Sequence, residues 1–224
     1  MESLVLLSGG LDSAVLAAQE ARTYVVHPVY VAAGLSWEEG EQRIIASLLG
    51  RPPFANAPNR VLPLARLEFN MRDVYPASHW ALQGTPPAYD TPDEDVYLHG
   101  RNVALLSKAS VYAAIRKISR LVVAPLAGNP FPDATPEFFS AINAALSLGL
   151  ASRIEVSAPF AHLHKEDVVK IGAELGVPFE LTLSCMNPSG TTHCGLCSKC
   201  RERRDAFHAA GVKDPTTYAS ISPR

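Results

Sequence analysis

The stretch from Leu4 to Ser13 constrains the fold more than any other part of the chain. It opens with four consecutive apolar residues, Leu4 to Leu7, which predict a short buried strand because the run is too brief for a helix. Gly9 and Gly10 then mark a tight turn. The run from Ala14 to Ala18 favours a helix. We therefore expect a buried strand, a glycine turn and a helix N-terminus in direct succession.

This predicted turn suits a phosphate group. The N–H groups at a helix N-terminus lack intrahelical partners and lie at the positive end of the helix dipole. Gly9 and Gly10 allow close approach to the backbone, and Ser8 and Ser13 add hydroxyl donors. A carboxylate such as Asp12 beside a phosphate indicates that a cation such as Mg²⁺ also binds. The alternative for the whole segment is an ordinary strand-to-helix turn without a ligand. The predicted nucleotide-binding residues are Leu7, Ser8, Gly9, Gly10, Leu11, Asp12 and Ser13.

The composition describes an ordinary globular protein and argues against several function classes. Of the 224 residues, 47% are hydrophobic and 19% are charged, and the net charge is −2. This balance lacks the basic excess that is typical of nucleic-acid binding. No apolar run approaches the ~20 residues of a membrane helix, and no basic segment precedes the first apolar run as in a signal peptide. We expect a cytoplasmic protein that has neither nucleic acid nor a membrane as its partner.

Strand and helix patterns alternate along the chain. Ser36 followed three residues later by Glu39 predicts a capping box at a helix start, and Thr135 before Pro136 predicts another helix N-terminus. The alternation predicts an α/β fold, a Rossmann-like parallel sheet with helices on both faces. The further predicted strands span residues 23–31, 61–64, 121–126 and 154–156. The predicted helices span residues 36–49, 103–116, 135–148 and 165–175.

Residues 70–95 show no periodicity. This stretch contains four prolines, Gly84 and several aromatic residues. We interpret it as a long surface loop over the active-site face. A functional lid and a purely structural loop are both compatible with this pattern.

The four cysteines all lie between positions 185 and 200. Their spacing brings four thiols together in tight turns, which indicates a tetrahedral Zn²⁺ site with Zn–S bonds of ~2.3 Å. Because four thiols complete the coordination shell, we expect this zinc to be structural. An iron–sulfur cluster and a redox-active cysteine pair are the alternatives. The predicted metal ligands are Cys185, Cys194, Cys197 and Cys200.

The cysteine segment also sets the predicted domain division. We expect Cys200 at the start of a helix that runs through Phe207, where the helix dipole helps to stabilise a thiolate. The zinc would tie the C-terminal tail to the main domain. The predicted division is an α/β domain over residues 1–180 and a zinc-binding helical region over residues 181–224.

The ends of the chain resemble known motifs. Ser8-Gly-Gly-Leu-Asp-Ser13 resembles the pyrophosphate-binding loop of the N-type ATP pyrophosphatases, and it lacks the spacing of the kinase P-loop. Together with the cysteine spacing, this loop resembles the 7-cyano-7-deazaguanine synthase family. Further matches to the family follow in order along the chain: Gly100-Arg101-Asn102, Phe131 to Phe138, Pro159 to Lys165, Thr182 to Cys185 and Cys194 to Arg203.

The resemblance implies an ATP-dependent carbon–nitrogen ligase of queuosine biosynthesis. In this family the carboxylate of 7-carboxy-7-deazaguanine is adenylated, and pyrophosphate leaves. Ammonia then displaces AMP to give an amide, and a second activation dehydrates the amide to the nitrile. The implied cofactors are ATP, Mg²⁺ and structural Zn²⁺. The resemblance also implies a homodimer.

Single residues acquire roles from the same resemblance. Arg101 would bind a phosphate or the substrate carboxylate, or would simply start a helix. Lys165 would contact a phosphate, or would be a solvated first-turn residue. Asp133 and Glu137 would read the donor edge of a guanine-like base, or would cap a helix. The implied catalytic residues are Asp12, Ser13, Arg101 and Lys165, and the implied substrate-binding residues are Arg101, Asn102, Asp133 and Glu137.

The chain departs from the family pattern at three places. Ala32 to Trp37 replace the usual Tyr-Gly-Gln-x-His segment, and Ala134-Thr135 replace Cys-Arg. Gly128 or Asn129 stands where an Asp is usual. The resemblance places substrate and metal contacts at these positions. An amide-forming or adenylating enzyme for another carboxylate or base, and a PP-loop thiolation enzyme, are therefore the alternatives.

Overall fold

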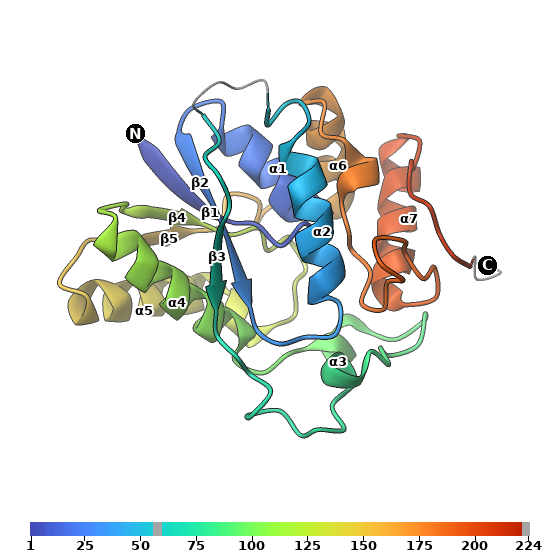
Figure 1. Ribbon diagram of the computed structural model, residues 1–224, viewed down its shortest axis with the longest axis horizontal. Helices are drawn as coiled ribbons and strands as arrows, with labels where there is room; N and C mark the ends of the chain where they lie inside the picture. The colour runs from blue at the N-terminus through green and yellow to red at the C-terminus, as the bar shows by residue number, and fades with distance from the viewer. Residues whose placement is uncertain (56–59, 221–224) are drawn as a thin grey trace.

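The fold is built on one parallel sheet, seen in a computed structural model that describes residues 1–55 and 60–220. Its strands lie in the order β3-β2-β1-β4-β5, so the first strand is central (Figure 1). Leu6 pairs with Val29 on one side of β1, and Val5 pairs with Val122 on the other. The strands are β1 (Glu2–Leu6), β2 (Val25–Ala32), β3 (Ala65–Glu68), β4 (Arg120–Val122) and β5 (Glu155–Ser157).

Helices cover both faces of this sheet, which confirms the predicted Rossmann-like α/β architecture. Alternate residues of β1 face opposite sides: Val5 packs beneath α1, α2 and α6, whereas Leu4 packs against α4 and α5 (Figure 1). The longer helices are α1 (Leu11–Glu20), α2 (Glu38–Leu49), α4 (Arg101–Ile115), α5 (Pro136–Gly149), α6 (Lys165–Glu174) and α7 (Ser198–Ala210). The short ones are α3 (Trp80–Gln83) and the 3₁₀ turns η1 (Asp93–Val96), η2 (Pro132–Ala134) and η3 (Phe179–Leu181).

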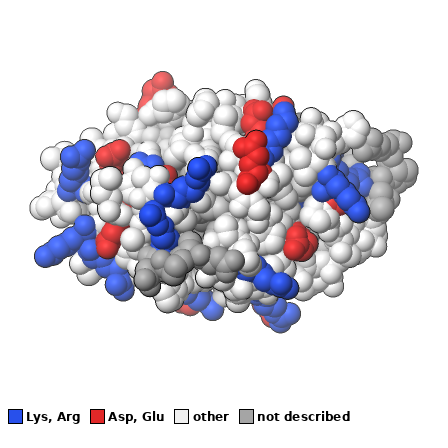
Figure 2. All heavy atoms as spheres, turned by 90° about the horizontal axis from the view of Figure 1, so that it is seen from above, with Lys and Arg blue, Asp and Glu red and all other residues white. Residues whose placement is uncertain are grey.

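The molecular surface carries charges of both signs. On the face shown in Figure 2, Lys and Arg side chains stand among Asp and Glu side chains. Such interspersed charges differ from the single-sign field that draws a protein to nucleic acid. Within residues 1–55 and 60–220, every helix falls short of the length and apolar character that a membrane span requires.

The strand order places a topological switch point next to β1. The chain moves outward from β1 through β2 to β3, and then crosses to β4 on the opposite side of β1. In open parallel sheets, ligands bind at the carboxyl ends of the strands where the connections diverge in this way. The loops after β1 and β4 therefore border the expected ligand cleft.

The third strand was predicted at the wrong place. It lies at Ala65–Glu68 rather than at residues 61–64. Val61 forms only an isolated bridge with Val26. Pro63 explains the break, because proline has no N–H to donate to a neighbouring strand.

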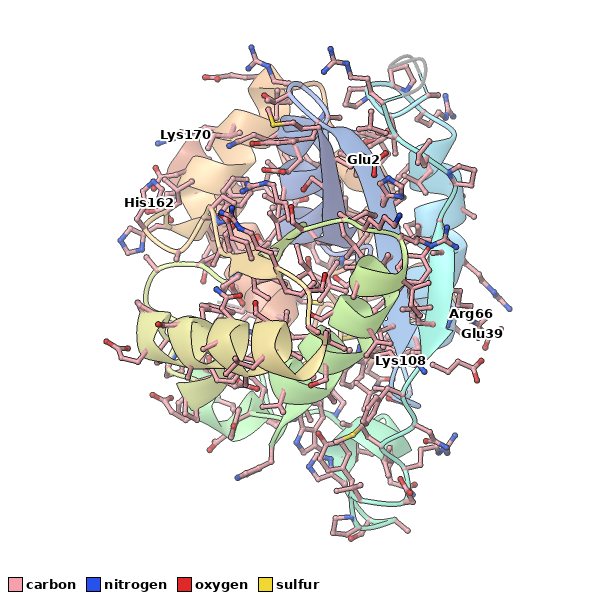
Figure 3. The ribbon with its side chains drawn as sticks, turned by 90° about the vertical axis from the view of Figure 1, so that its left-hand side faces the viewer. Glu2, Glu39, Arg66, Lys108, His162 and Lys170 are labelled. Atoms are coloured by element: carbon pink, nitrogen blue, oxygen red, sulfur yellow. The ribbon has the colours of Figure 1, made fainter. Side chains whose placement is uncertain are left out.

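The capping box predicted at Ser36 and Glu39 is also wrong. Helix α2 begins at Glu38, and Trp37 is its N-cap without a side-chain hydrogen bond. Glu38 instead accepts a 2.6 Å hydrogen bond from the N–H of Ala33, at the end of β2. Glu39 points outward, as Figure 3 shows, and pairs with Arg43. A hydrogen bond from Glu38 to the backbone just after β2 has replaced the predicted cap.

Other boundaries shifted in ways that matter for the cleft. The strand predicted over residues 121–126 ends at Val122, and the freed residues line the cleft. Residues 70–95 contain helix α3 and part of η1 rather than loop alone. The predicted cap at Thr135 is confirmed, since its hydroxyl accepts a hydrogen bond from the N–H of Phe138 at 3.1 Å.

Helix α7 packs against the main sheet domain. Phe207 of α7 meets Phe179 edge to face, with ring centroids 5.1 Å apart. Arg203, also on α7, is fully buried. Its guanidinium donates to the carbonyl of Phe179 and to the hydroxyl of Thr182, each at 2.8 Å. The division at residues 180 and 181 stays a prediction, and residues 221–224 of its second part lie outside the described residues.

Replacing Arg203 with Ala is expected to destabilise the protein. The substitution leaves buried acceptors unpaired and opens a cavity, which together cost about 3 kcal/mol or more. Urea denaturation of metal-loaded protein measures the free energy of unfolding. Lys213→Ala, an exposed site nearby, serves as the control and is expected to change this free energy by less than about 0.5 kcal/mol. Equal stability of the two variants would contradict the structural role of Arg203.

Candidate active site and metal centre

Two adjoining cavities form one cleft at the carboxyl edge of the sheet. Their volumes are about 320 Å³ and 260 Å³. Ser8, Gly10, Asp12 and Arg101 line both cavities, together with residues of the loop after β4. The cleft therefore lies at the switch point between β1 and β4, where the sheet topology predicts a ligand.

The glycine turn after β1 is fixed by close packing. Gly9 has a φ of 79°, and a Cβ at this position would lie 2.9 Å from a methyl group of Ile44. Its carbonyl accepts a 2.8 Å hydrogen bond from the N–H of Leu183. Gly10 is the N-cap of α1. The sequence-predicted strand, turn and helix N-terminus are therefore confirmed, and only glycine fits the first position of the turn.

The hydroxyl groups of the loop bond to one another and to the backbone. Ser13 Oγ lies 3.2 Å from Ser8 Oγ and donates to the carbonyl of Gly10 at 3.0 Å. The N–H of Gly10 donates to Ser8 Oγ at 3.2 Å. Leu7 and Leu11, which the sequence assigned to the same loop, are buried anchors with 1% exposure each. This arrangement preorganises the loop around the N-terminus of α1.

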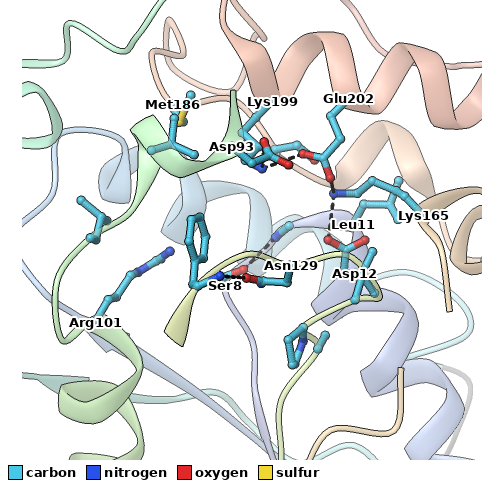
Figure 4. A pocket seen from close by; sticks show the side chains of 18 of the residues that line it. Ser8, Leu11, Asp12, Asp93, Arg101, Asn129, Lys165, Met186, Lys199 and Glu202 are labelled. Carbon is cyan, nitrogen blue, oxygen red and sulfur yellow. Dashed lines mark hydrogen bonds and ion pairs between the residues drawn. The ribbon is translucent and has the colours of Figure 1, made fainter. Parts of the chain in front are cut away.

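Asp12 and Lys165 form the charged centre of the cleft, shown in Figure 4. Lys165 Nζ lies 3.1 Å from Asp12 Oδ2 and 2.6 Å from Glu202 Oε1. Asp12 Oδ1 is buried and lacks a hydrogen-bond partner among the described residues. A carboxylate oxygen in this state, beside a predicted phosphate site, fits the ligand preference of Mg²⁺.

The charges of this centre support one another. Burial by itself lowers the pKa of Lys165, but Asp12 and Glu202 outweigh burial and hold that pKa above its ordinary value. Burial favours the neutral acid of Glu202, yet Lys165 and Lys199 lower its pKa to about 2. Lys165 and Glu202 are therefore both ionised at neutral pH.

Arg101 lies across the cleft from this centre. It is the first residue of α4, and its Nε is buried without a hydrogen-bond partner among the described residues. Since a buried guanidinium N–H without a partner is costly, this donor fits an anionic ligand. The structure thus brings Arg101, Lys165 and the glycine turn to one cavity.

Glu41 is a cleft residue that the sequence analysis did not single out. It is buried on α2, lines the larger cavity and accepts a 2.7 Å hydrogen bond from Tyr30 Oη. Burial raises the pKa of Glu41 to about 7, although the nearby charge of Arg101 acts to lower it. A signal for Glu41 was present in the sequence. Glu38 and Glu41 are two carboxylates three residues apart on an otherwise apolar face of a predicted helix.

The predicted base-recognition residues separate in the structure. Asp133 lines the smaller cavity, where its Oδ2 accepts from the N–H of Asn102 at 3.0 Å. Asn102 Nδ2 donates to the carbonyl of Asp133 at 2.9 Å, so this pair fixes the start of α4. Burial raises the pKa of Asp133, against the lowering effect of the hydrogen bond from Asn102. Glu137 is exposed in the first turn of α5 and borders neither cavity.

The cysteine segment forms a compact cluster of sulfur atoms. All four sulfurs lie within 4.8 Å of one another, as the spacing predicted. The Sγ–Sγ distances from Cys197 are 3.5 Å to Cys200 and 4.0 Å to Cys185, close to the about 3.8 Å expected between sulfurs of a tetrahedral zinc site. The N–H of Cys194 donates to Cys185 Sγ at 3.2 Å. The donor set and its geometry therefore fit a bound metal ion.

Helix α7 starts at this cluster. Its N-cap is Cys197, and Cys200 lies in its first turn, near the predicted place. The helix continues to Ala210, beyond the predicted end at Phe207. Its first turns also carry Lys199 and Glu202 into the cleft. The sequence analysis had assigned neither residue to the site.

Three further cleft residues were not singled out as site residues by the sequence analysis. Asp93 and Trp80 lie in residues 70–95, which were expected over the active-site face, and Trp37 lies in a segment that departs from the family pattern. Asp93 reaches the cleft from the segment before α4 and pairs with Lys199 at 3.2 Å. Trp37 and Trp80 stack with ring centroids 5.7 Å apart, and both line the larger cavity. Their isolated occurrence in the sequence offered no periodic signal.

The buried carboxyl of Glu41 is expected to make stability depend on pH. Burial, together with the negative charge of Glu38, raises its pKa from an ordinary value of 4.5 to about 7, while the charge of Arg101 and the hydrogen bond from Tyr30 act to lower it. The unfolded chain therefore ionises Glu41 first, and folding stability falls as pH increases between these two values. A pKa difference of this size corresponds to a loss of at most about 3 kcal/mol in the free energy of unfolding.

Glu41→Gln should remove this loss. Urea denaturation at pH 5 and at pH 8 measures it as the free energy of unfolding of each protein. The variant is expected to lose less stability between the two pH values than the unmodified chain. Glu39→Gln, on the exposed side of the same helix, is the control and should retain the original pH dependence. An unchanged pH dependence in Glu41→Gln would contradict the assigned burial effect.

Comparison with known proteins agrees with this site. The family model described as "Queuosine biosynthesis protein QueC" matches residues 2–211. A 7-cyano-7-deazaguanine synthase of Anaeromyxobacter dehalogenans is 33% identical, covering 97% of this chain and 95% of that protein. One of Caldicellulosiruptor saccharolyticus is 31% identical, with coverages of 97% and 96%. One of Methanopyrus kandleri is 47% identical over 92 residues, 39% of this chain and 40% of that protein. The chain therefore belongs to the QueC family of queuosine biosynthesis proteins.

Proposed function

We propose that this protein converts 7-carboxy-7-deazaguanine to 7-cyano-7-deazaguanine at the expense of ATP. The observation that carries the proposal is the cleft in which the glycine turn, Asp12, Lys165 and Arg101 meet. The full-length similarity to proteins named 7-cyano-7-deazaguanine synthase supports the substrate. No relative reported above has a name that supports the thiolation alternative. The enzyme class would be an ATP-dependent carbon–nitrogen ligase.

The chain's own residues suit binding of the ATP phosphates. The N-terminus of α1 and the hydroxyl groups of Ser8 and Ser13 would bind the leaving pyrophosphate. Lys165 and Arg101 would stabilise the negative charge that develops on the phosphate oxygens. Asp12 would hold Mg²⁺, which when bound neutralises phosphate charge. Together these groups favour attack at the α-phosphate.

Adenylation solves a chemical problem posed by the substrate. A carboxylate is a poor acyl donor because oxide is a poor leaving group. Attack of the carboxylate oxygen on the α-phosphate releases pyrophosphate and gives an acyl adenylate. Ammonia then adds, AMP leaves with the acyl oxygen, and one proton is released to give the amide. The amide oxygen then attacks the α-phosphate of a second ATP and pyrophosphate leaves. Loss of AMP with the former amide oxygen, and of both amide N–H protons, gives the nitrile.

Recognition of the base would involve the smaller cavity. Asn102 and Asp133 line it and are held by reciprocal hydrogen bonds. A carboxylate of this kind accepts from the N–H groups of a guanine-like edge. Glu137, exposed and outside this cavity, stays a prediction from the resemblance. The departure at Trp37 places an indole in the larger cavity, where planar rings stack favourably.

The cysteine cluster would bind a structural Zn²⁺. It offers four thiolates, three of them from buried residues, and so leaves no coordination site for a substrate. Its place at the start of α7 supports a role in fixing that helix. Homodimeric assembly, which the resemblance implies, and a cytoplasmic location, which the sequence pattern led us to expect, stay predictions.

Product analysis tests the proposed function. The protein is incubated with ATP, Mg²⁺, ammonium and 7-carboxy-7-deazaguanine, and products are identified by mass spectrometry. We expect the nitrile and AMP. Asp12→Ala should lower their formation at least about 100-fold, because a group that organises transition-state charge is lost. Asp73→Asn, exposed and outside the cleft, should retain activity. The amide alone, or no turnover of this carboxylate, would contradict the proposed reaction.

Cys197→Ser is expected to abolish stable zinc binding. The substitution removes one of four thiolates, and the binding energy of a structural zinc is part of the folding energy. Metal analysis should show less zinc than in the unmodified chain, and thermal unfolding should occur at a lower temperature. Leu196→Ala, an exposed position between the ligands, should retain both properties. A full complement of zinc and an unchanged unfolding temperature in Cys197→Ser would contradict the four-cysteine site.

A further inference from the structure

We propose that Glu202, which α7 carries from the cysteine cluster into the cleft, is a positioning residue for Lys165. The inference rests on the proposed function, because that function assigns Lys165 to the phosphate site of an ATP-dependent enzyme. The inference gives the C-terminal segment a role in the candidate active site, in addition to its packing against the main domain.

The contact distances support this assignment. Lys165 Nζ lies 2.6 Å from Glu202 and 3.1 Å from Asp12, so Glu202 is the nearer of its two partners. The Lys165 side chain is 14% exposed and that of Glu202 is 29% exposed. An ion pair this sheltered is screened less by solvent than one on the surface. In Figure 4 the ammonium group lies between the two carboxylates, one from α1 and one from α7.

Lys165 needs such a partner because of where its own helix places it. It is the first residue of α6, where the positive end of the helix dipole disfavours a cation. Its side chain is long and flexible, so holding it in one rotamer has an entropic cost. With Asp12 as its only partner, the ammonium would move toward the carboxylate that the proposed mechanism needs for Mg²⁺. Glu202 pulls it the opposite way.

Glu202 is itself held in place. Its Oε2 accepts a 2.8 Å hydrogen bond from Lys199, and Lys199 pairs with Asp93 at 3.2 Å. The helix that carries Glu202 is fixed at its start by the cysteine cluster and along its length by buried Arg203. The orientation of Lys165 therefore depends on a rigid helix rather than on a loop.

The same chain of charges shows that the test variant should fold. When Glu202 is neutralised, Lys165 retains Asp12 and Lys199 retains Asp93. No lysine of the network is left buried without a carboxylate, which is the situation that strongly destabilises proteins. Glu202→Gln also keeps the shape of the side chain.

Kinetics with ATP form the first test. Glu202→Gln should lower kcat roughly ten- to hundred-fold, since a small misplacement of a charge-stabilising group affects the reacting state most. KM for ATP should change much less, and zinc content and unfolding temperature should stay near those of the unmodified chain. The matched control is Glu166→Gln. Glu166 follows Lys165 on α6, lines a further pocket that Lys165 and Glu202 also border, and forms no ion pair with Lys165 among the described residues. Equal effects of the two substitutions would overturn the inference.

A double-mutant cycle identifies the route by which Glu202 acts. Lys165→Met removes the ammonium and should lower kcat at least as much as Glu202→Gln. If Glu202 acts through Lys165, adding Glu202→Gln to Lys165→Met should cause no further loss. Additive losses would mean that Glu202 acts on another group, and they would overturn its role as the positioning residue.

A crystal structure of nucleotide-free Glu202→Gln keeps the inference separate from the proposed reaction. We expect Lys165 Nζ to leave its place and approach Asp12, whereas in Glu166→Gln it should remain. This result would support the inference even if the unmodified protein fails to turn over 7-carboxy-7-deazaguanine. An unmoved Lys165 in Glu202→Gln would overturn the inference whatever the substrate proves to be.

Discussion

The half-buried ion pairs of Lys165 join parts of the chain that are distant in sequence. Its ammonium meets Asp12 from the first helix and Glu202 from the last one. A charge that is this little exposed would destabilise the fold if it lacked a partner. The ion pairs of Lys165 therefore favour the one arrangement of α1, α6 and α7 that brings its two carboxylates to it. That arrangement puts an ammonium group, a carboxylate with an unpaired oxygen and a helix N-terminus into one cleft.

The C-terminal segment extends this constraint to the metal site. Four cysteines define where α7 begins, and Arg203 bonds the helix to the backbone and hydroxyl groups of the segment that precedes them. The carbonyl of Gly9 accepts from the N–H of Leu183, just before the first cysteine. The glycine turn and the cysteine cluster, near opposite ends of the chain, are thus parts of one packed unit.

Local patterns predicted the elements better than their boundaries. The glycine turn, the cap at Thr135 and the cysteine spacing each depend on neighbouring residues, and the structure has all three. The cap predicted at Ser36 failed because Glu38 bonds instead to the end of a strand. The third strand moved past Pro63 because pairing with β2 needs N–H groups that proline lacks. Contacts with β2 or with the residue that follows it decided both cases.

The sequence by itself determined the α/β class, the glycine turn, the cluster of four thiols and, through its motifs, the family. These features follow from residue type and short spacing, which act within a few residues of the chain. Only the tertiary structure decided that Glu41, Asp93, Lys199 and Glu202 share a cleft with the glycine turn. Charged side chains look alike in a sequence whether they are solvated or buried. Their role becomes defined when folding removes water and leaves each charge with a particular partner.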